Sequence, residues 1–233
     1  MAVSVRSIRR FCYWFLLVAA ALAVAAGLLL TARSVHVAVD DDTSMEPAIA
    51  PGDHLLYVAP DGLRRGDIVL YRSAGLGLEV RRVIALPGDH VTCCNGQHRL
   101  TVDGHALRET YVYPGERPSQ RTFSVTLGPG RAWLLGDHRL FARDSSLTGP
   151  GATSAIAGRV TIIDHQGRLT SVRTPATFLA TGLAPPDNRP VLPLPWPVVA
   201  LAGFALLVLL LLGGIIAQVV RRVRRREARL APA

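Results

Sequence analysis

The residue types that could carry chemistry in this chain are a serine, Ser44, and the bases that could activate it. A hydroxyl becomes a useful nucleophile when a neighbouring base takes its proton. The chain contains no lysine, because all 26 of its basic residues are arginine, and it has seven histidines. A guanidinium stays protonated and cannot act as that base. A serine nucleophile in this chain would therefore need a base other than lysine or arginine.

Ser44 lies in the first of four short segments that occur in a defined order along the chain. The segments are Ser44-Met45-Glu46-Pro47, Arg65-Gly66-Asp67, Arg81-Arg82 with Gly88-Asp89, and Gly136-Asp137-His138-Arg139 through Asp144-Ser145. One serine followed by methionine carries little information. Four ordered segments at these spacings are far more specific.

Together the four segments resemble the signal peptidase I family. The likeness covers about residues 36–165 and the apolar segments outside them. The stretch from Val91 through Cys93-Cys94 to Gly104 is most similar to actinobacterial members. The resemblance implies a membrane serine endopeptidase that removes signal peptides from exported preproteins at the outer face of the membrane. It implies no cofactor and no metal.

Carried over residue by residue, the resemblance makes Ser44 the nucleophile and puts Arg81 where the family has its general-base lysine. Arg82 matches the basic residue that follows the lysine. Asp42 stands where the family often has a hydroxyl that helps to hold the oxyanion, and a carboxylate there opposes a developing negative charge. Ala142 replaces the serine that supports the lysine.

The remaining motif positions match more closely. Gly136, Asp137, Arg139 and Asp144 agree with the fourth segment of the family, whose terminal arginine appears here as Ser146. In the first segment, Pro47 is expected to fix the turn after the nucleophile. Met45 is compatible with contact to lipid or substrate and equally with core packing.

The simultaneous loss of base, supporting serine and oxyanion hydroxyl predicts an impaired or degenerate peptidase. A drift from lysine to arginine in a high-GC coding sequence explains an arginine-only chain in general, but not the loss of an essential base. Two histidines are candidate replacements for that base, since Ser-His-Asp arrangements recur on many folds. His138 lies inside the fourth segment and His90 follows Gly88-Asp89, and an ordinary hydrogen-bonded loop histidine is the alternative for both.

Two uncharged apolar runs, residues 11–31 and 198–220, are long enough to cross a bilayer as helices. A cleaved signal peptide is the alternative for the first run and a buried core helix for the second. Nine arginines flank the runs on their outer sides: Arg6, Arg9, Arg10, Arg221, Arg222, Arg224, Arg225, Arg226 and Arg229. Positive flanks stay in the cytoplasm, so both termini are predicted inside and the region between the runs outside.

The net charge of +9 comes from these tails. It is therefore interpreted as orientation at, and attraction to, the lipid bilayer, and not as a nucleic-acid surface. The predicted organisation has six parts: a basic cytoplasmic N-terminus (1–10), a transmembrane helix (11–31), an extracytoplasmic domain (32–183), a proline-rich linker (184–197), a second transmembrane helix (198–220) and a basic cytoplasmic tail (221–233).

The domain between the spans is predicted to be mainly β, an antiparallel-sheet fold. Short apolar or alternating runs recur between Gly-Asp turn signals, and no long amphipathic helix is apparent. The runs are residues 36–39, 55–58, 68–71, 80–85, 90–92, 100–102, 122–127, 132–135 and 160–163.

Cys93 and Cys94 are adjacent and predicted to be outside, while Cys12 lies at the edge of the first span. The adjacent pair is compatible with a vicinal disulfide, with two free thiols or with bonds to another chain. Two adjacent cysteines make a poor zinc site, and no Cys-x-x-Cys or His-x-x-x-His pattern supports one.

Three functions follow from these observations. The first is a working signal peptidase that holds an extended peptide as an added strand. The second is a non-enzymatic relative that binds signal peptides or membrane proteins on the same platform. The third is a self-cleaving regulator of the related repressor type, which ranks last because that class normally carries a DNA-binding domain and this sequence shows none. The base at position 81 distinguishes the first two.

Overall fold

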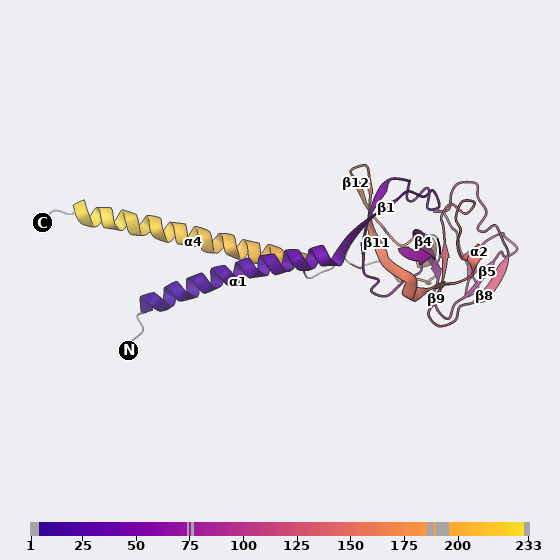
Figure 1. The fold of residues 1–233 in the computed structure, drawn as a ribbon, viewed down its shortest axis with the longest axis horizontal. Helices are drawn as coiled ribbons and strands as arrows, with labels where there is room; N and C mark the ends of the chain where they lie inside the picture. The colour runs from indigo at the N-terminus through magenta and orange to yellow at the C-terminus, as the bar shows by residue number, and fades with distance from the viewer. Residues whose placement is uncertain (1–4, 74, 76, 186–188, 190–195, 231–233) are drawn as a thin grey trace. The chain divides into compact units, whose positions relative to one another are not determined.

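The computed structural model describes residues 5–73, 75, 77–185, 189 and 196–230. The chain divides into two compact units (Figure 1). One comprises Met1–Ser34 with Pro193–Ala233, and the other is Val35–Leu192. Most of the predicted proline-rich linker lies outside the described residues.

The first unit is a pair of long helices, α1 (Val5–Ser34) and α4 (Trp196–Leu230). Within them, Phe11–Ser34 and Trp196–Arg225 are long and apolar enough to cross a membrane, with mean hydropathies of 2.5 and 2.8. Helix α4 begins two residues before the predicted span, at Trp196. Pro197 is tolerated there because the first turn of a helix needs no amide donor from it.

Small residues bring α1 and α4 together. A Cβ added to Gly203 would lie 3.1 Å from the backbone nitrogen of Val24 and 3.2 Å from the carbonyl oxygen of Ala20. The hydroxyl of Tyr13 donates to the carbonyl oxygen of Leu210 at 2.9 Å. Close backbone approach at small residues is how apolar helices gain contact when lipid is as apolar as their side chains.

The second unit is built from two antiparallel sheets. The larger has the order β1-β2-β11-β3-β4-β9-β10, with β12 paired to β11, and the smaller has the order β7-β6-β5-β8. The larger sheet consists of β1 (Val35–Asp40), β2 (Asp53–Val58), β3 (Ile68–Ser73), β4 (Gly77–Ala85), β9 (Arg131–Leu135), β10 (Gly151–Ala152), β11 (Ile156–His165) and β12 (Arg168–Ser171). The smaller consists of β5 (His90–Cys93), β6 (Thr101–Val102), β7 (His105–Ala106) and β8 (Phe123–Thr126).

This architecture confirms the predicted mainly β, antiparallel fold, and every predicted run overlaps a strand. The strands that the sequence did not indicate are β7, β10 and β12. Two of these have only two residues, too few to show an alternating pattern. The helical segments described in this unit are short: α2 (Ser145–Thr148), the 3₁₀ turn η1 (Thr153–Ala155) and α3 (Ala176–Ala180).

The core of the β unit anchors the segment that carries Ser44. Met45 and Ile49 are fully buried and pack with Leu55, Leu70 and Val160. Of the two roles considered for Met45, the structure therefore shows core packing. Burying a side chain of this size contributes about 1.5–3 kcal/mol. The residues after Ser44 are thus held by the sheet beneath them.

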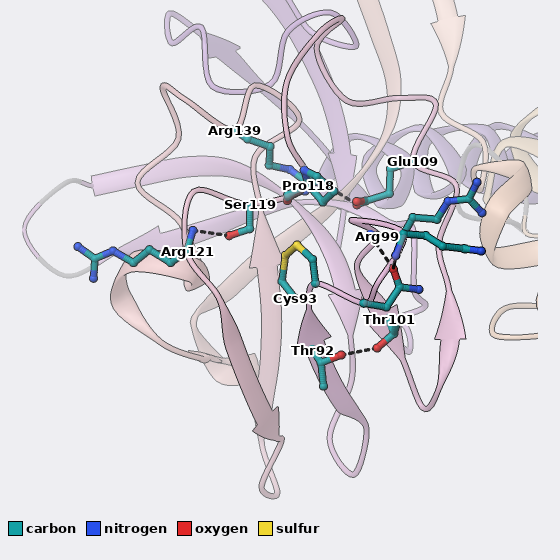
Figure 2. The surroundings of a disulfide bond; sticks show 12 residues. Thr92, Cys93, Arg99, Thr101, Glu109, Pro118, Ser119, Arg121 and Arg139 are labelled. Carbon is teal, nitrogen blue, oxygen red and sulfur yellow. Dashed lines mark hydrogen bonds and ion pairs between the residues drawn. A yellow bond between two sulfur atoms is a disulfide. The ribbon is translucent and has the colours of Figure 1, made fainter.

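Cys93 and Cys94 are joined by a disulfide bond at the end of β5 (Figure 2). Cys12 is a free, exposed cysteine on α1. Of the alternatives considered for the adjacent pair, the structure has the vicinal disulfide.

Candidate active site

Ser44 lies in the loop after β1 and is 1% exposed. Its carbonyl oxygen accepts a hydrogen bond from the backbone nitrogen of His138 at 2.9 Å. This bond joins the first sequence segment to the fourth, although they are far apart along the chain. The packing of Met45 in the hydrophobic core fixes the same segment through its side chain. The position of Ser44 is therefore fixed by both backbone and side-chain contacts.

Arg81, on β4, reaches Ser44 directly. Its Nη1 donates to the Oγ of Ser44 at 2.8 Å and to the carbonyl oxygen of Val80 at 2.6 Å. Its Nη2 lies 3.1 Å from Oε1 of Glu79 and donates to the carbonyl oxygen of Arg143 at 3.3 Å. The structure thus brings together the residue at the nucleophile position and the residue at the base position. The group that faces Oγ is a donor with no lone pair to accept the serine proton.

The backbone N–H of Ser44 is directed at a carboxylate. It donates to Oδ1 of Asp42 at 3.3 Å. By the resemblance, this N–H would be one of the donors to the oxyanion. An oxyanion forming there would compete with Asp42 for the N–H and would be repelled by its charge.

Asp40 adds a buried carboxyl group to this region. Burial, and then the nearby charge of Asp42, raise the pKa of Asp40 to about 6, while a hydrogen bond from the backbone of Asp42 and the charge of Arg81 act in the opposite direction. Its Oδ2 is buried and has no hydrogen-bond partner among the described residues. A carboxyl group in this setting is more stable when protonated.

Replacing Asp40 by Asn tests this effect. The folded chain holds the Asp40 proton more tightly than the unfolded chain, so its contribution to stability is present below about pH 4 and is lost as pH rises towards about 6. We expect Asp40→Asn to remove that loss and to raise the unfolding free energy at neutral pH by about 1–3 kcal/mol. Thermal unfolding of the full chain in detergent at about pH 5 and pH 7.5 measures it. An unchanged pH dependence would contradict the expectation.

Gly136 and Ala142 pack against the backbone of Ser44. A Cβ on Gly136 would lie 2.6 Å from the carbonyl oxygen of Ser44 and 2.3 Å from the Cβ of Ala142. Glycine is therefore required at position 136. The methyl group of Ala142 is buried at this contact and offers no hydroxyl to support a base.

Asp144 fixes the end of the loop that begins at Gly136. Its carboxylate accepts from the backbone nitrogen of Gly136 at 3.1 Å and from the backbone and hydroxyl of Ser146 at 3.0 and 2.7 Å. It is also the N-cap of α2. Asp144 is therefore a structural residue in this arrangement, because its oxygens are used to close the loop.

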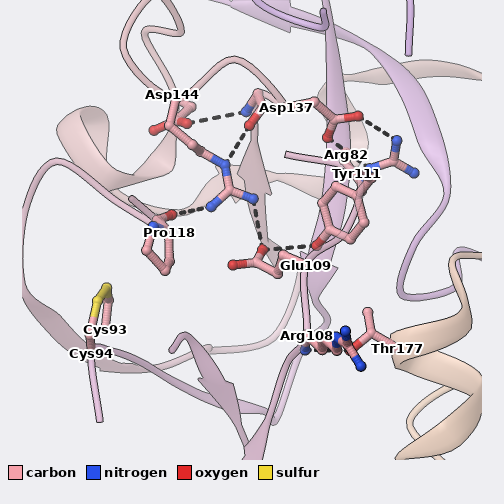
Figure 3. Close-up of polar contacts among 12 residues, drawn as sticks. Arg82, Cys93, Cys94, Arg108, Glu109, Tyr111, Pro118, Asp137, Asp144 and Thr177 are labelled. Atoms are coloured by element: carbon pink, nitrogen blue, oxygen red, sulfur yellow. Dashed lines mark hydrogen bonds and ion pairs between the residues drawn. A yellow bond between two sulfur atoms is a disulfide. The ribbon is translucent and has the colours of Figure 1, made fainter. Parts of the chain in front are cut away.

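Arg82 and Asp137 form a buried, bidentate ion pair (Figure 3). The two contacts are 2.8 Å from Nε to Oδ1 and 2.5 Å from Nη2 to Oδ2. The guanidinium also lies over the ring of Tyr111, 4.4 Å from its centre. Asp137 is 0% exposed. The pair ties β4 to the loop after β9.

Arg139 completes this network. It donates to the carbonyl oxygens of Gly136 and Pro118 and to Oε1 of Glu109, the last at 2.7 Å. Oε1 of Glu109 also accepts from the hydroxyl of Tyr111 at 2.9 Å. Burial and the Glu109 charge raise the pKa of Tyr111 well above its ordinary value. The motif residues Arg82, Asp137, Arg139 and Asp144 therefore stabilise the loop that follows β9, and none of them makes a hydrogen bond to the Oγ of Ser44 among the described contacts.

The two candidate histidines have other partners. Nδ1 of His138 lies 3.1 Å from the carbonyl oxygen of Thr43, and Nε2 lies 3.2 Å from Oε1 of Glu116. Its ring stacks on Tyr113 at 4.0 Å. His90 lies in the smaller sheet, with Nε2 3.0 Å from the hydroxyl of Ser124. Among the described residues, neither ring makes a hydrogen bond to the Oγ of Ser44.

Two acidic residues at this site were missed by the sequence reasoning. Glu79 pairs with Arg81, and Asp40 lies buried at the start of the loop. The run Asp40-Asp41-Asp42 directly before Thr43-Ser44 was a signal for the second. In the part of the chain that the structure describes, no group of three or more histidine, cysteine or carboxylate side chains could hold a metal ion.

Comparisons with known proteins identify the family. The family model "Signal peptidase, peptidase S26" matches residues 11–164. A probable signal peptidase I of Mycobacterium leprae is 31% identical over 138 residues, which is 47% of this chain and 47% of that protein. A signal peptidase I of Mycobacterium tuberculosis is 36% identical over 75 residues, 28% of this chain and 25% of that protein. The chain thus spans half or less of these mycobacterial relatives.

A signal peptidase I of Bacillus caldolyticus is 30% identical over 165 residues, 63% of this chain and 85% of that protein. A crystal structure of a signal peptidase I from Enterococcus faecalis aligns with a TM-score of 0.38 and 25% identity, covering 43% of this chain and 98% of the other. The family model covers well over half of the chain, from the first apolar helix to the end of β11. The chain therefore belongs to the signal peptidase family, peptidase S26.

Proposed function

We propose that this chain is a membrane-anchored signal peptidase relative that binds signal peptides and does not cleave them by the serine–lysine mechanism. The observation that carries the proposal is the contact of the Arg81 guanidinium with the Oγ of Ser44 at 2.8 Å. A lysine can lose its proton when it is desolvated, and an arginine cannot. At this position the side chain holds the serine hydroxyl as a hydrogen-bond donor and has no means of activating it.

Two further contacts support the same conclusion. The N–H of Ser44 is engaged by Asp42, so the position of the oxyanion faces a carboxylate. Ala142 brings a methyl group to the place from which a hydroxyl would support a base. General-base catalysis typically accelerates a reaction about 10²–10⁴-fold, and a single oxyanion donor contributes a further factor of about 10²–10³. Losing both terms leaves little hydrolysis above background.

An unpaired strand edge supports the binding half of the proposal. Strand β4 pairs with β3 along Gly77–Arg82, but β9 pairs with it only from Arg82 onward. Among the described strands, none pairs with the β9-facing edge of the first part of β4. An extended peptide can add to such an edge through its backbone groups, and Leu78 beside it is exposed. The ligand class we propose is therefore an extended signal-peptide segment with small side chains.

Binding without cleavage is tested with a fluorescent signal peptide that has Ala at the two key small positions. The full chain in detergent is expected to bind this peptide and to release no product, and Ser44→Ala is expected to bind it equally well. The matched control is the same peptide with N-methylated backbone amides, which cannot pair with a strand and should bind at least about tenfold more weakly. Equal binding of both peptides, or none, would refute a strand-addition platform.

We also propose that the chain crosses the membrane twice, with both termini in the cytoplasm and the β unit outside. The nine flanking arginines and the two apolar helices support this topology. A reporter that is active only outside the cytoplasm should be silent when fused after Ala233 and active when inserted near Gly115. The reverse pattern would show that Ser44 faces the cytoplasm and would remove access to exported proteins.

A further inference from the structure

The Cys93–Cys94 disulfide is a reactive group that the Ser44 site does not use. Cys93 is buried, and Cys94, the first residue after β5, is half-buried. The chain then turns back, with the backbone nitrogen of Asn95 donating to the carbonyl oxygen of Arg99 at 2.9 Å. Figure 2 shows the side chains around the disulfide, among them Arg99, Glu109 and Pro118. The bond therefore lies in a polar part of the molecule.

A cavity of about 140 Å³ is lined in part by the same three residues, Arg99, Glu109 and Pro118, that surround the disulfide in Figure 2. Drug-sized ligands need about 300–1,000 Å³, so this volume suits a much smaller molecule. Arg108 and Glu116 complete its charged lining. The cavity therefore presents two cations and two carboxylates to one small occupant.

One carboxylate oxygen among the residues that line the cavity lacks a donor. Oε2 of Glu109 is buried and has no hydrogen-bond partner among the described residues, whereas Oε1 is taken by Arg139 and Tyr111. Arg99 and Arg108 are exposed, and neither guanidinium forms an ion pair with another described side chain. A buried carboxylate oxygen without a donor is costly, and an ammonium group supplies one. The two arginines suit a carboxylate on the same molecule.

We propose that Cys93–Cys94 is a thiol-exchange site and that the cavity binds the small thiol that opens it, a thiol that carries both an ammonium and a carboxylate group. The incoming thiolate attacks Sγ of Cys94, the more exposed cysteine. A bond forms between the two sulfurs while the Cys93–Cys94 bond breaks, and its electron pair leaves on Cys93 as a thiolate. A second thiolate attacks the sulfur of the bound small molecule and releases Cys94 as a thiolate.

Overall, two small thiols are oxidised to their disulfide, and one protein disulfide is reduced to two thiols. The two protons lost by the small thiols end on Cys93 and Cys94.

The test compares four thiols on the full chain in detergent: L-cysteine, cysteamine, 3-mercaptopropionate and 2-mercaptoethanol. Released cysteines are alkylated and counted by intact mass, and each rate is divided by the thiolate fraction of the reagent. We expect cysteine to react about tenfold faster per thiolate than the other three, with a rate that saturates as its concentration rises. In Cys93→Ala, whose Cys94 is a free thiol, cystine is the reagent: exchange should leave a cysteine adduct on Cys94 and release one cysteine.

Two variants and one matched control connect the preference to the cavity. Arg99→Gln and Arg108→Gln, both at exposed positions, should reduce the advantage of cysteine. Arg121→Gln should keep it, because Arg121 lies beside the disulfide but does not line the cavity. Equal rates per thiolate for all four reagents would overturn the proposal. So would a disulfide that resists all four until the protein is unfolded, or a preference that Arg121→Gln abolishes and Arg99→Gln leaves intact.

Discussion

A chain carrying Arg81→Lys, Ala142→Ser and Asp42→Ser together is expected to cleave a signal peptide that the unmodified chain leaves intact. The lysine supplies a group that can lose its proton, the new serine at position 142 supports it, and the hydroxyl at position 42 replaces the carboxylate that now engages the N–H of Ser44. Rate terms for a general base and one oxyanion donor together amount to about 10⁴ or more. Product release measured by mass spectrometry, in detergent, gives the answer.

The single change Arg81→Lys should recover little, and the structure adds a reason that the motifs did not show. Glu79 lies 3.1 Å from Nη2 of Arg81 and is mostly buried. A carboxylate at this distance would favour the ammonium form of a lysine, raise its pKa and reduce the fraction that can act as base. Adding Glu79→Gln to the triple variant should therefore increase cleavage further near neutral pH.

Two control experiments test this prediction. Ser44→Ala in the triple variant should abolish cleavage, which would show that the restored reaction uses the expected nucleophile. Robust cleavage by the unmodified chain that disappears with Ser44→Ala would contradict the proposed function. In that case His138→Ala and His90→Ala would identify whether either imidazole supplies the base.

Asp137→Asn is expected to cause the largest loss of stability of any single change considered. Asp137 is 0% exposed and neutralises the buried guanidinium of Arg82 through two contacts. Removing one partner of a buried pair leaves an uncompensated charge and costs about 3–5 kcal/mol. Denaturant unfolding of the full chain in detergent measures this cost.

Asp61→Asn is the matched control for that measurement. Asp61 also faces an arginine, Arg159, at 3.7 Å, but its side chain is 67% exposed. Arg159 is buried, but the exposed Asp61 carboxylate is screened by water, so we expect its loss to cost only about 0–1 kcal/mol. Similar losses for the two variants would show that the Arg82–Asp137 pair does not brace the fold.

The sequence predicted the strands better than it predicted the site. The alternating run 122–127 indicated β8, and short, largely apolar runs between turn signals, such as residues 132–135 and 160–163, indicated β9 and β11. The order of the motifs indicated that Ser44 and Arg81 meet, and the structure places them 2.8 Å apart. Their roles were implied by the family resemblance, and the inability of arginine to act as a base needs no coordinates.

The direction of the side chains around Ser44 could not be obtained in the same way. A carboxylate at position 42 could have turned towards solvent, and only the loop conformation shows that it accepts from the N–H of Ser44. Glu79 and Arg81 are two residues apart on β4 and so share a face of the sheet, but their 3.1 Å ion pair depends on side-chain rotamers that the sequence does not give. The separate partners of His138 arise from Thr43 and Glu116, which no local pattern connects to it.

The crowding at Gly136 has a consequence for how proteins of this kind are counted in genomes. A side chain there would collide with Ala142 and with the carbonyl of Ser44 whether or not any peptide bond is ever hydrolysed. Asp137 and Arg139 likewise hold the loop through ion pairs that need no catalysis. Selection for a stable fold alone would therefore be enough to preserve these residues in any relative that no longer hydrolyses peptides. A census that scores them as marks of proteolysis will count folded relatives as working enzymes, and the residue at position 81 is the one to inspect first.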